Sequence, residues 1–148
     1  MKRTLLLVLV VLAYHLSNNP FEAVAQSADK TSTKLLHGIL AKTEQGVPTT
    51  KFSSGAQKIY AFWKGDKLKL GDTIRIVWMA EIVGYSKNAR IAESSAVAYK
   101  PDDDGIFSLA RPAGGWPAGK YRAEIYVGDK LAETLKFTIE PDVTVEVH

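Results

Sequence analysis

Apolar and polar residues alternate with a period of two along much of the chain from residue 57 onward. The longest run covers residues 73–82, and its apolar positions are Ile74, Ile76, Trp78, Ala80 and Ile82. Successive side chains of a β-strand point to opposite faces, so this run predicts a strand with one face toward a core. Shorter runs at 107–109, 121–127 and 135–140 predict three further strands of the same kind.

Turn-forming residues separate these runs at short intervals. Glycine, proline and aspartate gather at 64–67, 71–72, 101–105, 112–115 and 128–130, because turns need positive φ or local side-chain hydrogen bonds. The pair Gly128-Asp129 between two apolar runs predicts a tight hairpin. Short strands at this spacing, without helical periodicity after residue 55, predict an all-β antiparallel sandwich of about seven to eight strands.

The segment before these strands is less regular. Residues 34–42 are apolar and fit either a short helix or a first strand, and Gly38 in the middle favours the strand because glycine weakens a helix. Residues 43–55 are rich in threonine, serine, glycine and proline, which predicts a loop.

The N-terminal residues have the features of an export signal. Lys2 and Arg3 precede an apolar run, and Ala23-Val24-Ala25 supplies a cleavage site of small residues. We therefore expect a cleaved signal peptide over residues 1–25, a flexible leader over 26–33 and one domain over 34–148. The predicted location is periplasmic or secreted, with no stable membrane span after cleavage, since the apolar run is short of the roughly 20 residues a bilayer requires.

The composition limits which covalent links and which partners we expect. The chain contains no cysteine, so the domain would be held by packing without a disulfide. Removing Lys2, Arg3 and Glu22 from the formal net charge of +3 leaves +2. A charge this small and mixed does not indicate a nucleic-acid partner, which requires a concentrated basic face.

Several short segments carry a resemblance that spans about residues 52–139. They are FSSG (52–55), KIYAF (58–62), GD (71–72), Trp78, FSL (107–109), GWPAGKYRAEIYVGDK (115–130) and FTI (137–139). With them the chain resembles a recurring bacterial exported domain of immunoglobulin or fibronectin-III type. The resemblance implies an immunoglobulin-like sandwich in a family largely without assigned function.

Two positions within this resemblance have a physical interpretation. Gly119-x-Tyr121-x-Ala123 is similar to the tyrosine corner of immunoglobulin domains, with Ala123 where those domains place a cysteine. Trp78 matches the buried tryptophan of the central strand, which would have to pack on aliphatic side chains here. We expect Trp78, Tyr121, Ile125 and Phe137 to form part of the core.

Candidate catalytic groups are few. After signal removal only His37 and His148 remain as histidines, and no nucleophile–histidine–acid set or metal-ligand spacing can be assembled. Glutamates at 81 and 93, or at 124 and 133, could pair as acid and base, although outward glutamates on alternating strands are usually solvated. The sequence therefore predicts a protein without enzymatic activity, cofactor or metal.

Three successive aspartates at residues 102–104 leave two interpretations open. Clustered carboxylates are the ligands that calcium prefers. The run lacks the spaced ligands of a helix–loop–helix calcium site, which favours an acidic turn.

Aromatic residues supply the candidate ligand surface. Residues 59–63 place apolar side chains on both faces of one strand, whereas a sandwich strand has one core face. Either a loop covers the second face, or that face is exposed for a ligand. The residues that could form such a surface, including by stacking on sugars, are Tyr60, Trp63, Trp116 and Tyr126.

We therefore expect an exported, non-enzymatic module that binds another envelope or extracellular protein through strand-edge and loop contacts, or acts as an accessory domain. The alternative is a carbohydrate-binding module that uses exposed aromatic residues.

Overall fold

The computed structural model describes residues 34–143, and their regular structure consists of eight β-strands. The strands are β1 (Leu36–Ala41), β2 (Lys51–Ser53), β3 (Lys58–Gly65), β4 (Thr73–Val83), β5 (Ser86–Val97), β6 (Asp104–Ala110), β7 (Gly119–Val127) and β8 (Lys130–Glu140). No helix in the described part of the chain has the length and apolar character that crossing a bilayer requires. The expected signal peptide (1–25) and leader (26–33) lie outside the described residues.

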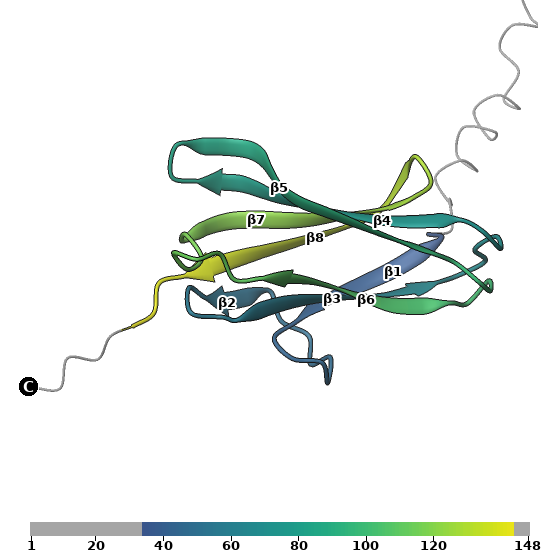
Figure 1. Ribbon diagram of the computed structural model, residues 1–148, viewed down its shortest axis with the longest axis horizontal. Helices are drawn as coiled ribbons and strands as arrows, with labels where there is room; N and C mark the ends of the chain where they lie inside the picture. Colours follow the sequence, from purple (N-terminus) through teal and green to yellow (C-terminus); the bar gives the residue numbers. More distant parts are fainter. Residues whose placement is uncertain (1–33, 144–148) are drawn as a thin grey trace, which may run out of the picture. The chain divides into compact units, whose positions relative to one another are not determined.

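The strands form two sheets that pack face to face (Figure 1). One sheet has the order β1-β3-β6, and the other has the order β2-β8-β7-β4-β5. All neighbours run antiparallel except β2 and β8, which are parallel. This arrangement confirms the predicted all-β immunoglobulin-like sandwich.

Strand β1 confirms that residues 34–42 form a strand, but the prediction of an uninterrupted loop over 43–55 was wrong. Residues Lys51–Ser53 form β2, in which Phe52 pairs with Ile139 of β8. Phe52 is buried, and its ring meets Phe137 edge to face at 5.6 Å between centroids. Burial of this one aromatic ring explains why a polar segment with a weak strand pattern joins the sheet.

The core lies between the sheets and uses the alternate positions that the pattern predicts. All four expected core residues are buried, at exposed fractions of 0–3% for Trp78, Tyr121, Ile125 and Phe137. Trp78 does not pack on aliphatic side chains alone, because its ring meets Phe137 edge to face at 6.2 Å. Ala123 lies directly opposite Trp78 in the register of β4 and β7, so a small side chain leaves room for the indole.

One predicted core position is exposed. Ile82 follows an irregularity in the pairing of β4 with β7, between Ala80 and Ile82, and 48% of its surface is accessible. Beyond this point β4 and β5 continue as a hairpin that projects from the end of the sandwich (Figure 1). The periodicity of β4 therefore continues past the region where a second sheet covers it.

The tyrosine corner is present without a disulfide. The Tyr121 hydroxyl donates a hydrogen bond to the Pro117 carbonyl at 2.6 Å, while its ring stacks on Phe137 at 5.3 Å. This bond ties the loop before β7 to the start of that strand. The predicted hairpin also forms, with Gly128 at φ 58° between β7 and β8.

Tyr121→Phe tests the corner bond separately from ring packing. Phenylalanine keeps the stacked ring and loses the hydroxyl, so we expect the free energy of unfolding to fall by about 1 kcal/mol in urea at neutral pH. A variant as stable as the wild type would show that the corner bond contributes nothing net.

We also expect the stability of the wild type and that of Tyr121→Phe to depend differently on pH. Burial raises the pKa of the Tyr121 hydroxyl, so the folded state keeps this proton at a pH where the unfolded state has released it. Stability is then fully present below the unfolded value of about 10 and falls as pH rises above it. Urea unfolding followed from pH 8 to 11 should show a steeper alkaline loss for the wild type than for Tyr121→Phe.

Candidate functional site

The four aromatic residues predicted to form a ligand surface are not brought together. Tyr60 and Trp63 lie on β3 in the three-stranded sheet, and Tyr126 lies on β7 in the other sheet. Trp116 lies in the segment between β6 and β7.

Two of them cannot offer a ring face to a ligand, because they are buried. Trp63 is 4% exposed, and its ring packs over Gly105 and stacks on Phe107 at 6.4 Å. Trp116 is 3% exposed, and its indole nitrogen donates to the Ala56 carbonyl at 2.7 Å. Both rings pack inside the domain, which corrects the prediction that Trp63 and Trp116 belong to a ligand surface.

Tyr126 is partly buried and already has partners. The Arg75 guanidinium lies 4.4 Å from its ring centroid, and its hydroxyl donates to Glu124 Oε2 at 2.7 Å. This hydrogen bond lowers the pKa of Glu124 and raises the pKa of Tyr126. Arg122 completes the network through Glu124 Oε1 at 2.9 Å. A ligand would have to displace the Arg75 side chain to stack on this ring.

The glutamates that could have paired as acid and base have cations as partners instead. Glu93 pairs with Arg75 at 3.5 Å and Arg90 at 2.8 Å. The other three of these glutamates form the ion pairs Lys136–Glu81 at 3.7 Å, Arg122–Glu124 at 2.9 Å and Lys34–Glu133 at 3.1 Å. Within residues 34–143, no three acidic, histidine or cysteine side chains gather as a metal site would require.

The acidic segment before β6 acts as a turn. Asp103 accepts hydrogen bonds from the backbone N–H groups of Tyr99 at 2.8 Å and Asp104 at 3.0 Å, one on each carboxylate oxygen. The bond from Tyr99 is the main cause of the lowered pKa of Asp103. Of the two interpretations of residues 102–104, this geometry favours the turn.

The outer face of the three-stranded sheet is the first candidate surface. On β3, Ile59, Ala61 and Trp63 face the core, so the alternate residues Lys58, Tyr60, Phe62 and Lys64 face outward. The rings of Tyr60 and Phe62 are partly buried. A side chain at Gly46 would contact the Phe62 ring, so the loop after β1 covers part of this second apolar face.

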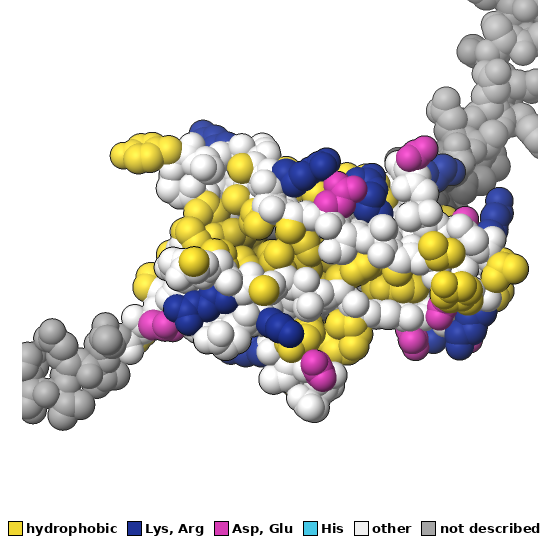
Figure 2. Space-filling model, in the orientation of Figure 1, with side chains coloured by type: hydrophobic (Ala, Val, Ile, Leu, Met, Phe, Trp, Pro, Cys, Tyr) yellow, Lys and Arg dark blue, Asp and Glu magenta, His cyan; other side chains and the backbone are white. Residues whose placement is uncertain are grey.

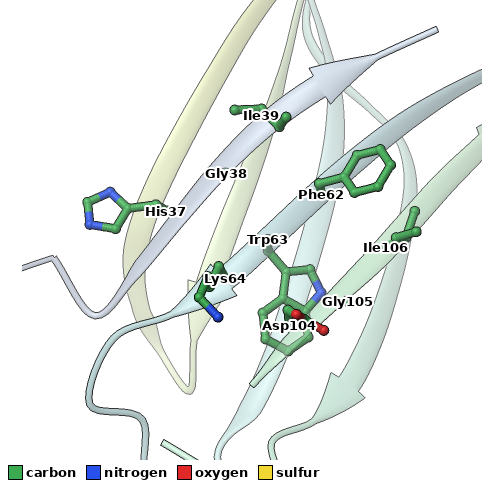
Figure 3. Close-up of a pocket in the computed structure, with 9 residues that line it drawn as sticks. All are labelled: His37, Gly38, Ile39, Phe62, Trp63, Lys64, Asp104, Gly105 and Ile106. Carbon is green, nitrogen blue, oxygen red and sulfur yellow. The ribbon is translucent and has the colours of Figure 1, made fainter. Parts of the chain in front are cut away.

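Two hollows lie along this face. The apolar hollow, of about 490 Å³, is lined by Ile39, Phe62 and Ile106, which sit side by side on β1, β3 and β6 (Figure 3). The next row across the same strands is His37, Lys64 and Asp104. The cationic hollow, of about 710 Å³, is lined by Lys42, Lys58, Arg111, Tyr60, Gln57 and Ser53, with no acidic residue in its wall.

Strand β5 is the second candidate surface. It has 12 residues, lies at the edge of the five-stranded sheet beside β4, and exposes most of its side chains. The turn that joins it to β4 carries Tyr85, which is fully exposed. Figure 2 shows hydrophobic side chains at the tip of this hairpin and in the seam between the sheets.

Sequence reasoning missed the cationic hollow and the open edge for different reasons. Lys42, Lys58 and Arg111 are far apart in the chain and meet only through strand pairing. The weak alternation of residues 86–97 was a usable signal for an edge strand, because β5 packs only small side chains, Ala92 and Ala96, against the core.

Comparisons with known proteins find structures that are similar to this chain but do not identify its family. No family model matches the chain, and no curated protein matches it. An immunoglobulin-like protein from Pseudomonas aeruginosa is 14% identical, with 71% of this chain and 91% of that chain covered and a TM-score of 0.46.

Two β-glucosidases are also similar in part. The enzyme from Listeria innocua, in complex with glucose, is 8% identical over 70% of this chain with a TM-score of 0.45, and this chain spans 16% of its length. The enzyme from Erythrobacter marinus is 12% identical over 71% of this chain and 15% of its own length, with a TM-score of 0.41. At such scores no activity carries over, and the fold assignment rests on strand order and register.

Proposed function

We propose that this protein is a non-enzymatic, extracytoplasmic binding module that takes up an extended segment of another protein along β5. The observation that carries the proposal is the length and openness of this edge. Strand β5 has 12 residues, whereas the opposite edge of the same sheet, β2, has three. Proteins usually keep edge strands short or cover them, because a free edge can pair with another chain.

The chemistry of an open edge defines the partner. An edge strand presents a row of backbone N–H and C=O groups, and a second extended polypeptide complements that row. Residues 86–97 contain no proline, and the register of β5 is uninterrupted over residues 92–97, before the shift in its pairing with β4 at Trp78/Met79. The sandwich behind β5 is rigid, because Trp78 and Ile76 of the neighbouring strand β4 are buried in the core.

The charges near β5 modulate this binding. Glu93 is held by Arg75 and Arg90, whereas exposed Lys87 forms no ion pair with a described residue. Ile82 lies between Lys87 and Lys120 in the pairing of β5, β4 and β7. A partner strand that pairs with β5 lies next to Lys87, so a carboxylate opposite that position is favoured.

The test starts from peptides selected on the protein from a random peptide library. Hydrogen exchange with and without a selected peptide should show increased protection of β5 amides, because new cross-strand bonds form there. Protection confined to other elements, or binding by self-association of β5 into a dimer seen in sedimentation, would contradict the proposal.

Two proline variants provide the matched control. Amides of successive residues in an edge strand point alternately toward the neighbouring strand and away from it, so Ser94→Pro and Ser95→Pro remove amides of opposite orientation. Both positions are exposed. The variant that keeps the urea unfolding transition of the wild type has lost the outward amide, and it should bind the peptide about tenfold more weakly.

A further inference from the structure

We propose a second binding site, independent of β5, in which the outer face of β3 takes an acidic oligosaccharide. The carboxylates of the sugar chain would bind in the cationic hollow, and its pyranose rings would lie along Tyr60 and Phe62. The site is on the sheet opposite to β5, so it does not depend on the peptide edge.

Three cationic side chains surround the larger of the two hollows. Lys42, Lys58 and Arg111 line one hollow, and all three side chains are exposed. The ion pairs among residues 34–143 involve other cations, so these three have no acidic partner there. Three free cations around a hollow without an acidic wall complement a ligand with more than one carboxylate.

Two aromatic rings lie on β3 next to these charges. Tyr60 and Phe62 are alternate residues on the same face of β3, so their positions are about 6.7 Å apart along the strand. They lie on β3 between Lys58, which lines the cationic hollow, and Lys64, which lines the apolar hollow. Tyr60 lines the cationic hollow and Phe62 lines the apolar hollow, so the exposed parts of the two rings can contact the apolar C–H faces of successive sugar rings.

Polar groups and shape favour a sugar over other anions. Gln57 and Ser53 line the cationic hollow with amide and hydroxyl groups, which can donate to and accept from sugar hydroxyls. The two hollows, of about 710 and 490 Å³, lie along one strand and are open. In the apolar hollow the charges of Lys64 and Asp104 offset one another, whereas the cationic hollow has only positive charges, so the carboxylates are directed to the end that holds Lys58.

Calorimetric titration with a linear oligomer of galacturonic acid tests the site. We expect binding to the wild type at low salt and no detectable binding of the neutral oligomer cellohexaose. Lys58→Gln combined with Arg111→Gln should weaken galacturonate binding by about tenfold or more. Tyr60→Ala should weaken it by about tenfold, while Tyr60→Phe should retain wild-type affinity because the ring is kept.

The control removes the same charge elsewhere. Lys100→Gln combined with Lys130→Gln likewise removes two exposed cations, one between β5 and β6 and one from the β7–β8 hairpin, and should change affinity by less than about twofold. Each variant is first shown to keep the wild-type unfolding transition.

Three outcomes would overturn the proposal. Equal weakening by the control variant would assign binding to net charge alone. Polyglutamate binding with the affinity of the galacturonate oligomer and the same dependence on Lys58 and Arg111 would show an anion site without preference for sugar. Absence of galacturonate binding at low salt would remove the site, and none of these results bears on peptide uptake by β5.

Discussion

Replacing Trp78 with alanine is expected to lower the free energy of unfolding by about 3–5 kcal/mol, the largest effect of any substitution considered for this chain. Trp78 is 1% exposed and lies on β4, the strand between β7 and β5. Its ring meets Phe137 edge to face at 6.2 Å, and Ala123 lies opposite in the neighbouring strand. Removing the indole leaves a cavity that alanine neighbours cannot fill.

A second substitution separates ring volume from polarity. The Trp78 indole nitrogen is buried and has no acceptor among the described residues, and a buried donor without a partner is destabilising. Trp78→Phe removes this donor and keeps an aromatic ring, so it should cost clearly less than Trp78→Ala. Urea unfolding of the three proteins measures both differences, and a wild-type midpoint for Trp78→Ala would refute the placement of Trp78 in the core.

Gly105→Ala is expected to destabilise the protein by about 1–3 kcal/mol, although it adds only one methyl group. A Cβ at position 105 would lie 2.7 Å from atoms of the Trp63 ring. That ring is 4% exposed and stacks on Phe107, so it cannot move aside without disturbing the core. The overlap outweighs the small gain from restricting the unfolded chain.

The matched control is Gly114→Ala, where a Cβ meets no atom within 4 Å. This variant should stay within about 0.5 kcal/mol of the wild type. Combining Gly105→Ala with Trp63→Leu should cost less than the sum of the two single changes, because the smaller side chain removes the overlap. If Gly105→Ala were as stable as Gly114→Ala, the close packing of Trp63 over Gly105 would be wrong.

Core residues could be predicted on strands that turn one face toward the opposite sheet and the other face toward solvent. Trp78, Tyr121, Ile125 and Phe137 follow a period of two, and their burial needs only the alternation of strand side chains. The tyrosine corner was predicted from the resemblance of Gly119-x-Tyr121-x-Ala123 to immunoglobulin domains, and its hydrogen bond is local, since the hydroxyl of Tyr121 reaches a carbonyl four residues away.

Exposure of the aromatic residues was not predictable in the same way. Trp63 and Trp116 are of a residue type that often forms ligand surfaces. In the structure, Gly105 leaves room for the Trp63 ring, and the Ala56 carbonyl accepts a hydrogen bond from the Trp116 indole. Ile82 continues an apolar alternation and is nevertheless exposed, because β4 extends past the sandwich. These outcomes depend on partners distant in the chain.

The sequence by itself determined the all-β class, the strand periodicity, the hairpin at Gly128 and the absence of a disulfide, because each follows from local patterns or from composition. Only the tertiary structure decided that β2 joins β8, that β5 is an open edge, and that Lys42, Lys58 and Arg111 share one hollow. The physical reason is that sheet order and strand register join residues far apart in the chain, and alternation along one strand does not specify its neighbour.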